Sequence, residues 1–252
     1  GGTLNLSLNG GTIQVSSTAT AAQKAAFMTG LTSATVNAGG VTFNTNGQDI
    51  TVGQALLAGT GSGGLTKTGL GTLTLSGANT YTGDTTVNAG TLSVTGSIAS
   101  SAVVNSTFRL SGTSTGNITV NSGGTLGGEG STSGSVTFAN SGTTFTFDPA
   151  TGNVFSAASV NLGTSVIQLA ADTPMTAGNT YVVMTNNSGF SGSPTTNFRS
   201  PGRGTLAYSG NDLQFTFNGA ASITWKGADG TNPTFWDVET TLNWDNAGTP
   251  DK

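Results

Sequence analysis

Few residues of this chain carry groups that perform acid–base or covalent chemistry. Its 252 residues include 11 Asp and Glu, seven Lys and Arg, no His and no Cys. The missing types exclude histidine-based catalysis, cysteine nucleophiles, disulfides and the usual zinc sites. The many Ser and Thr hydroxyls have no His partner to activate them. We therefore assign no catalytic, cofactor-binding or metal-binding residue and expect a protein that is not an enzyme.

One pair of acids is the exception that merits a test. Glycan-cleaving enzymes need two carboxylates, or a carboxylate with Lys or Arg, that converge on one groove. Glu129 and Asp148 are separated by about the length of one internal repeat, so they lie side by side if the chain coils with that period. The competing interpretation is that both are solvated turn residues. A β-helical polysaccharide-active enzyme is therefore the third-ranked function.

The charge pattern limits the possible partners. Charged residues make up 7% of the chain and the formal net charge is −4, whereas a typical soluble domain has roughly 25% charged residues. Nucleic-acid binding requires clustered Lys and Arg that neutralise phosphates, and no such cluster exists here. No apolar run approaches the length of a membrane span. We expect neither a nucleic-acid partner nor a membrane-spanning segment.

The local pattern predicts strands along most of the chain. Short runs such as residues 73–75, 92–94, 145–147 and 213–217 alternate apolar residues with Thr, Ser or Gln, as a half-buried strand does. Gly and Asn clusters between these runs favour tight turns. Residues 20–29 differ, because they contain strong helix formers behind a capping-box pair, Thr20 and Gln23. We expect one short helix there, with an ordered loop as the competing interpretation.

Internal repetition indicates the architecture. Similar segments recur around five Asn residues, which we interpret as a ladder of turn residues: Asn88, Asn105, Asn121, Asn140 and Asn161. An earlier copy surrounds Asn37. The step from one Asn to the next is long enough for two or three short strands with tight corners, and stacked coils pair equivalent strands in parallel. An antiparallel sandwich also uses short alternating strands, but the recurring turn chemistry favours a parallel β-helix.

Two adjoining segments resemble a known family. GGLTKTGLGTLTLSGANTYTG (residues 63–83) and TTVNAGTL (residues 85–92) resemble the autotransporter-associated β-strand repeat, also called the passenger-associated transport repeat. The resemblance implies a right-handed parallel β-helix (a β-solenoid) of an autotransporter passenger-like protein. It also implies an extracellular or bacterial cell-surface location, and it supplies no catalytic residues.

The composition suggests three parts. Residues 1–60 are expected to form N-terminal coils with the helical excursion, and residues 61–219 the shaft that contains the repeat at 63–94. Residues 220–252 hold all three Trp residues, Trp225, Trp236 and Trp244, and five of the 11 acids. We interpret this tail as a junction or the start of another module. Buried Trp with solvated acids, Ca²⁺ binding by clustered oxygens and sugar stacking on Trp are its open alternatives.

The functional prediction is a structural module of an extracellular or cell-surface fibre. Exposed β-helix ends invite pairing, so the expected partners are other copies of this chain or tandem repeats of it. The alternative is an adhesin passenger shaft that binds surface glycans or proteins, with residues 186–203 as the candidate binding loop. A solvated excursion is the competing interpretation of that loop.

Overall fold

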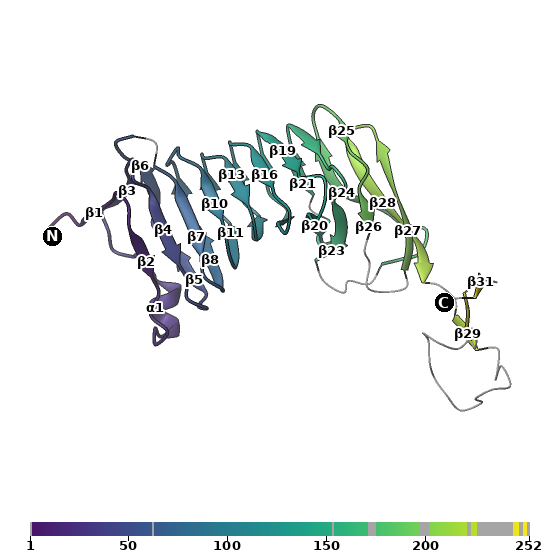
Figure 1. The fold of residues 1–252 in the computed structure, drawn as a ribbon, viewed down its shortest axis with the longest axis horizontal. Coiled ribbons are helices and arrows are strands. Elements are labelled where there is room, and N and C mark those ends of the chain that lie inside the picture. Colours follow the sequence, from purple (N-terminus) through teal and green to yellow (C-terminus); the bar gives the residue numbers. More distant parts are fainter. Residues whose placement is uncertain are drawn as a thin grey trace.

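The structure is a computed structural model that describes residues 2–61, 63–152, 154–170, 175–196, 202–220, 223–225, 244–246 and 249–250. Its main body is a parallel β-helix in which most coils contribute one strand to each of three sheets. The coils stack side by side along the long axis, from β1 near the N-terminus to β27 and β28 (Figure 1). This confirms the predicted all-β solenoid.

The first face is a sheet of nine parallel strands. In spatial order its members are β2 (Thr12–Gln14), β4 (Val41–Asn44), β7 (Leu65–Thr68), β10 (Thr85–Val87), β13 (Ala102–Val104), β16 (Ile118–Val120), β19 (Ser135–Phe138), β22 (Ser159–Asn161) and β25 (Phe190–Ser191).

The second face is a sheet of eight parallel strands. Its members are β5 (Ile50–Val52), β8 (Thr72–Leu75), β11 (Thr91–Val94), β14 (Thr107–Leu110), β17 (Thr125–Gly127), β20 (Thr144–Phe147), β23 (Val166–Leu169) and β26 (Thr195–Thr196).

The third face begins with a three-stranded sheet, β1 (Asn5–Leu8), β3 (Ser33–Val36) and β6 (Leu56–Ala58). It continues beside β6 as an eight-stranded sheet of β9 (Ala78–Asn79), β12 (Ser97–Ile98), β15 (Thr113–Ser114), β18 (Ser131–Thr132), β21 (Phe155–Ala157), β24 (Thr180–Asn186), β28 (Asp212–Ala220) and β27 (Gly202–Ser209). The junction is direct, because Thr80 N donates to Leu56 O at 2.9 Å. The last two strands form a hairpin, and β28 runs antiparallel to both β24 and β27.

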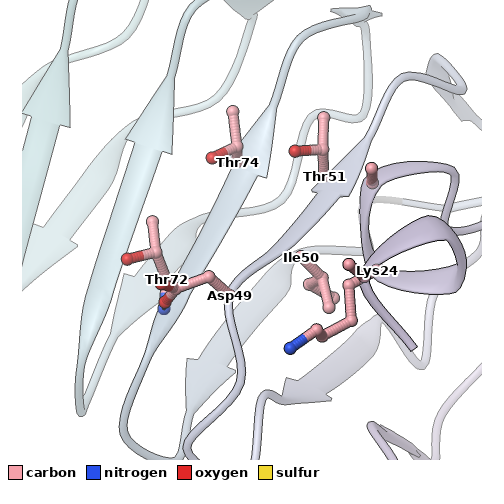
Figure 2. Close-up of a pocket in the computed structure, with 8 residues that line it drawn as sticks. Lys24, Asp49, Ile50, Thr51, Thr72 and Thr74 are labelled. Atoms are coloured by element: carbon pink, nitrogen blue, oxygen red, sulfur yellow. The ribbon is translucent and has the colours of Figure 1, made fainter. Parts of the chain in front are cut away.

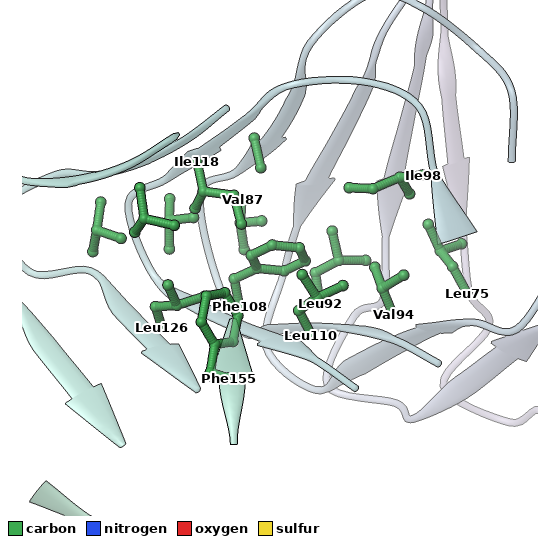
Figure 3. Close-up of a cluster of buried hydrophobic side chains, with 14 of the residues drawn as sticks. Leu75, Val87, Leu92, Val94, Ile98, Phe108, Leu110, Ile118, Leu126 and Phe155 are labelled. Carbon is green, nitrogen blue, oxygen red and sulfur yellow. The ribbon is translucent and has the colours of Figure 1, made fainter. Parts of the chain in front are cut away.

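Alternation along each strand fills the narrow core. On the second face one inward position is apolar on seven successive coils and buried on each: Ile50, Leu73, Leu92, Phe108, Leu126, Phe145 and Ile167. Figure 3 shows such side chains meeting between the sheets. Phe145 also packs edge-to-face against Phe155, with ring centroids 5.7 Å apart. This shared apolar column fixes the register, since a one-residue slip would expose every member.

The predicted short helix is present as α1 (Ala21–Ala25). The Thr20 side chain accepts from Gln23 N, and the Gln23 side chain accepts in return from Thr20 N, so the capping box is complete. The helix ends before residue 29 because Phe27 forms a parallel bridge with Val52. The segment between β2 and β3 therefore occupies the place of a second-face strand, and α1 lies beside β5.

The tail contains a separate antiparallel sheet of β29 (Ile223–Trp225), β30 (Trp244–Asn246) and β31 (Thr249–Pro250). Trp225 and Trp244 are opposite each other in its register, whereas Trp236 lies outside the described residues. Four of the five tail acids, all except Asp245 on β30, also lie outside them. The part of the chain described here contains no helix long and apolar enough to cross a membrane.

Candidate functional site

Polar residues of the repeat segment are buried inside the shaft. Lys67 is fully buried on β7, where it occupies an apolar column between Phe43 and Val87. Its ammonium group donates to three backbone carbonyls, Gly69 O at 2.7 Å and Thr68 O and Ala89 O at 3.0 Å. Burial lowers the pKa of Lys67 to about 8, against the opposing influence of Asp49. Lys67 thus joins the corner after β7 to the corner of the next coil.

A second buried group occupies the corners around β9. Asn79 accepts from Leu56 N at 3.0 Å and donates to Gly77 O and Ser97 O, both at 2.9 Å. These bonds connect three successive coils. Each donor and acceptor they use would be costly to bury without a partner, so Asn79 stabilises the stack at this corner.

Tyr81 begins a short chain of buried hydroxyls. Its hydroxyl lies 2.6 Å from Thr85 Oγ1, which in turn lies 2.7 Å from Ser100 Oγ. All three side chains are buried. Desolvation raises the pKa of Tyr81 to about 12 despite the hydrogen bonds from Thr85 and Ser100. This chain of hydroxyls connects Tyr81 to β10 of the first face and to Ser100, in the connection that precedes β13 on the next coil.

Lys67, Asn79 and Tyr81 were not identified as site residues from the sequence. For Lys67 the signal was available, because period-two alternation in Leu65-Thr66-Lys67 places the lysine on the same inward face as Leu65. Asn79 lies on a two-residue strand, too short for any periodicity. The hydrogen bonds of these residues hold neighbouring coils together.

The Asn ladder is shorter than the sequence predicts. Asn105 Nδ2 donates to Asn88 Oδ1 at 2.9 Å, and Asn121 Nδ2 donates to Asn105 Oδ1 at 2.7 Å. The coils then lengthen unevenly, since Ile118 on β16 is opposite Val136 on β19, which is itself opposite Val160 on β22. Asn140 consequently lies one position beyond the equivalent of Asn121, and Asn161 two positions before it.

Asn140 and Asn161 therefore lie outside the register of the hydrogen-bonded Asn ladder. Asn161 Oδ1 accepts from Gly163 N at 3.0 Å, a local turn bond. On the earlier coils, Asn44 and Thr68 are paired in register, and continuing the β7–β10 register places Asn88 opposite Thr68. Asn37 instead follows β3 on the third face. The same Asn-Gly turn chemistry thus serves two corners, which the sequence alone does not distinguish.

The two acids of the pair each follow a strand of the second face, Glu129 after β17 and Asp148 after β20. Gly127 is opposite Thr146 in that face, but Ser131 is opposite Ser156 in the third face. The corner that contains Asp148 is therefore longer than the corner that contains Glu129, and the strand register does not pair the two acids. Asp148 Oδ1 accepts from Ala150 N at 2.9 Å, and Asp148 O accepts from Thr151 Oγ1 at 3.2 Å. Both acids are half-buried. Asp148 therefore stabilises the turn formed by the residues that follow it.

The calcium alternative concerns the tail, of whose five acids only Asp245 is among the described residues. Within the part of the chain that the structure describes, no three acids lie close enough to bind a metal ion together. The candidate binding loop is partly drawn into the last coil, because β25 pairs with β22 and β26 pairs with β23. Phe190 of this segment stacks on Tyr208, with ring centroids 5.4 Å apart. Residues 197–201 of the loop lie outside the described residues.

Comparison with known proteins matches the segment that contains these buried residues. Residues 65–94 match the family model of the passenger-associated-transport-repeat, which confirms the family resemblance over that segment. This segment extends from β7 to β11 and includes Lys67, Asn79 and Tyr81.

Two extracellular serine proteases of Serratia marcescens are similar to part of the chain. One is 53% identical over 55 residues, which is 22% of this chain, and the other is 48% identical over 52 residues, which is 21%. Each match covers only 5% of the relative's length.

Proposed function

We propose that this chain is a shaft module of a secreted or surface-displayed bacterial passenger, a rigid β-helix that holds other parts of its parent protein at a distance from the cell. The observation that carries the proposal is the position of the repeat. Three polar residues within it, Lys67, Asn79 and Tyr81, are buried and joined by hydrogen bonds to neighbouring coils. Buried polar groups that link one coil to the next favour a structural role for this segment.

The extracellular location rests on the relatives. Both similar proteins are named extracellular serine proteases, and the matched repeat is named for passenger transport. Their protease activity is not transferred to this chain. A Ser-His-Asp triad requires His, and the sequence has none. We therefore propose a non-enzymatic shaft, in which no serine protease activity of the relatives' type is expected.

The shaft also extends by stacking, either on another copy or on a tandem module. At the N-terminal side, β1 and β2 are the outermost strands of their sheets, whereas α1 lies beside β5 at the edge of the second face. Unpaired edge groups of parallel strands accept a further strand. An added coil would pair through the first and third faces.

A surface-display experiment tests the shaft function. An N-terminal epitope, one or two tandem copies of the chain and an outer-membrane anchor are fused, and the distance of the epitope from the membrane is measured by immunogold electron microscopy. Two copies should increase the distance in proportion to the added coils. The core variant Phe108→Asp is the control, and it should lose that spacing because it buries a charge in the column. An epitope distance independent of copy number would contradict the proposal.

A separate measurement addresses catalysis. The purified chain is incubated with a fluorophosphonate probe that labels activated serines and with casein. Neither labelling nor cleavage is expected, since the chain has no His to activate a serine. Stoichiometric labelling of one serine would contradict the non-enzymatic assignment.

A further inference from the structure

A pocket of about 490 Å³ lies between α1 and the second face (Figure 2). Its volume lies within the range of about 300–1,000 Å³ that small-molecule sites occupy, although it is an open depression on the surface rather than an enclosed cavity. The lining residues from α1 are Ala21, Lys24 and Ala25, and those from the sheet side are Asp49, Ile50, Thr51, Thr72 and Thr74. The helix therefore forms one wall and the strands form the floor.

The polar groups of this pocket are mixed in character. In Figure 2, Lys24 extends from the helix toward the strands, and Thr51 and Thr74 project from the sheet. Lys24 Nζ donates to Gln48 Oε1 at 3.1 Å. Asp49 Oδ1 accepts from Thr72 N at 2.6 Å, which fixes the carboxylate at the edge of the floor. An ammonium donor, a carboxylate acceptor and hydroxyls that do both thus line one opening.

This mixture matches a neutral polyol. The vicinal hydroxyls of a sugar each donate and accept, so a carboxylate, an ammonium group and several threonines satisfy them together. An anionic ligand would lie near Asp49, and a cationic ligand would lie near Lys24. The pocket chemistry therefore favours an uncharged sugar unit over either charged class.

A column of threonines continues from the pocket along the second face. Five consecutive coils place Thr at the same register position: Thr72, Thr91, Thr107, Thr125 and Thr144. All five are half-buried with outward-facing side chains. Neighbouring strands lie about 4.8 Å apart, so the register places one threonine on each coil at about that spacing, beginning with Thr72 at the pocket.

We propose that this pocket and column bind a linear neutral polysaccharide, with a terminal sugar in the pocket against α1 and the following units along the threonine column. This inference goes beyond the shaft function and deepens the adhesive alternative. A shaft would keep its length without binding any glycan, so the display experiment and the binding experiment fail independently.

The test is isothermal titration of the purified chain with maltohexaose, cellohexaose and laminarihexaose. We expect one of these probes to bind, with affinity reduced at least tenfold by Ala25→Trp, which fills the pocket, and by Thr74→Val, which removes one hydroxyl at constant shape. Thr86→Val is the matched control on the first face. Its neighbour in register is naturally Val103, so the substitution should leave fold and binding unchanged.

The outcomes are decisive. Thermal unfolding shows whether each variant keeps the wild-type fold. If Ala25→Trp does not keep it, the binding of Thr74→Val alone tests the proposal. No binding of any neutral probe overturns the proposal, as does binding that neither pocket variant weakens. Preferential binding of an alginate hexasaccharide would overturn the assignment to neutral sugars.

Discussion

At the residue scale, two buried titratable groups give the fold opposite pH dependences. The pKa of Lys67 is lowered from 10.5 to about 8 in the folded chain. Between pH 10.5 and pH 8, more of the unfolded chain than of the folded chain carries this proton. The free energy of unfolding therefore decreases as the pH falls through this range. The pKa of Tyr81 is raised from 10.0 to about 12, so stability falls as the pH rises above 10.

We therefore predict that the free energy of unfolding increases from pH 8 to a maximum near pH 10. The Lys67 contribution across this window is at most about 3 kcal/mol. Denaturant unfolding at pH 7, 8, 9, 10 and 11 measures the profile. Lys67→Met should flatten the rise below pH 10, and Tyr81→Phe should reduce the loss above it. An unchanged slope in Lys67→Met would contradict the assignment of this proton to Lys67.

The asparagine ladder gives a second residue-scale prediction. Asn105 both donates to Asn88 and accepts from Asn121, so Asn105→Leu removes two bonds between coils. Because each net hydrogen bond contributes about 1 kcal/mol, we expect a loss of about 1–2 kcal/mol in chemical unfolding.

Asn140→Leu is the matched control for the ladder. Asn140 lies one position outside the register of the bonded Asn residues, so the loss should be clearly smaller. Equal losses in both variants would show that the side-chain ladder is not the cause.

At the element scale, glycines permit the tight corner between the second and third faces. Gly96, Gly112 and Gly130 succeed one another on adjacent coils, and a Cβ on Gly112 would clash with the backbone carbonyl oxygen of Gly96. Because that contact is with backbone, the coils themselves would have to separate. Gly112→Ala should therefore destabilise the chain by about 2–3 kcal/mol or more.

Gly53→Ala is the control for this corner. A Cβ on Gly53 would meet only Ser76 Oγ, at an ordinary 3.6 Å. Its melting temperature should stay within a few degrees of the wild-type value, while that of Gly112→Ala falls. If the melting temperature fell by a similar amount in both variants, the loss of stability would come from the strand or turn propensity of Gly and not from the close approach of the coils.

The elements also show how far the sequence predicts the fold. Alternation and the repeated turns were sufficient for the parallel β-helix, and the Thr20–Gln23 capping box located α1. The coil register beyond β16 was not predictable from the Asn spacing, because insertions in later corners lengthen the step from β16 to β19 and again from β19 to β22. The end of α1 depends on the distant bridge between Phe27 and Val52, which no local pattern contains.

The candidate site was less predictable than the fold for a related reason. Lys67 is charged, and its burial depends on carbonyls from its own corner and from Ala89 on the next coil. The pocket beside α1 combines residues from a helix and two strands that are distant in sequence. Local propensity gives the type of each element, whereas these sites arise from the way in which coils are placed on one another.

At the scale of the whole molecule, the shaft is a one-dimensional stack in which each coil contacts its neighbours. Assembly then depends on the outermost strands. On β2, Gly11 O accepts from Thr42 N and Val15 N donates to Asn44 O. Alternate residues of a strand direct their backbone groups to opposite sides, so Gln14 N–H points away from β4 and toward an incoming coil.

Gln14→Pro should therefore weaken stacking while leaving the inner ladder intact, because Pro lacks the outward N–H and is tolerated on edge strands. Sedimentation velocity over a range of concentrations measures assembly, and we expect Gln14→Pro to form longer species only at higher concentrations than the wild-type chain does, since the β1 edge of the third face remains. Gln14→Ala is the control, since it keeps the N–H and should assemble as the wild type does. Equal assembly of all three proteins would mean that copies do not meet through the first face at β2, and a monomeric wild-type chain at every concentration would argue against end-to-end assembly altogether.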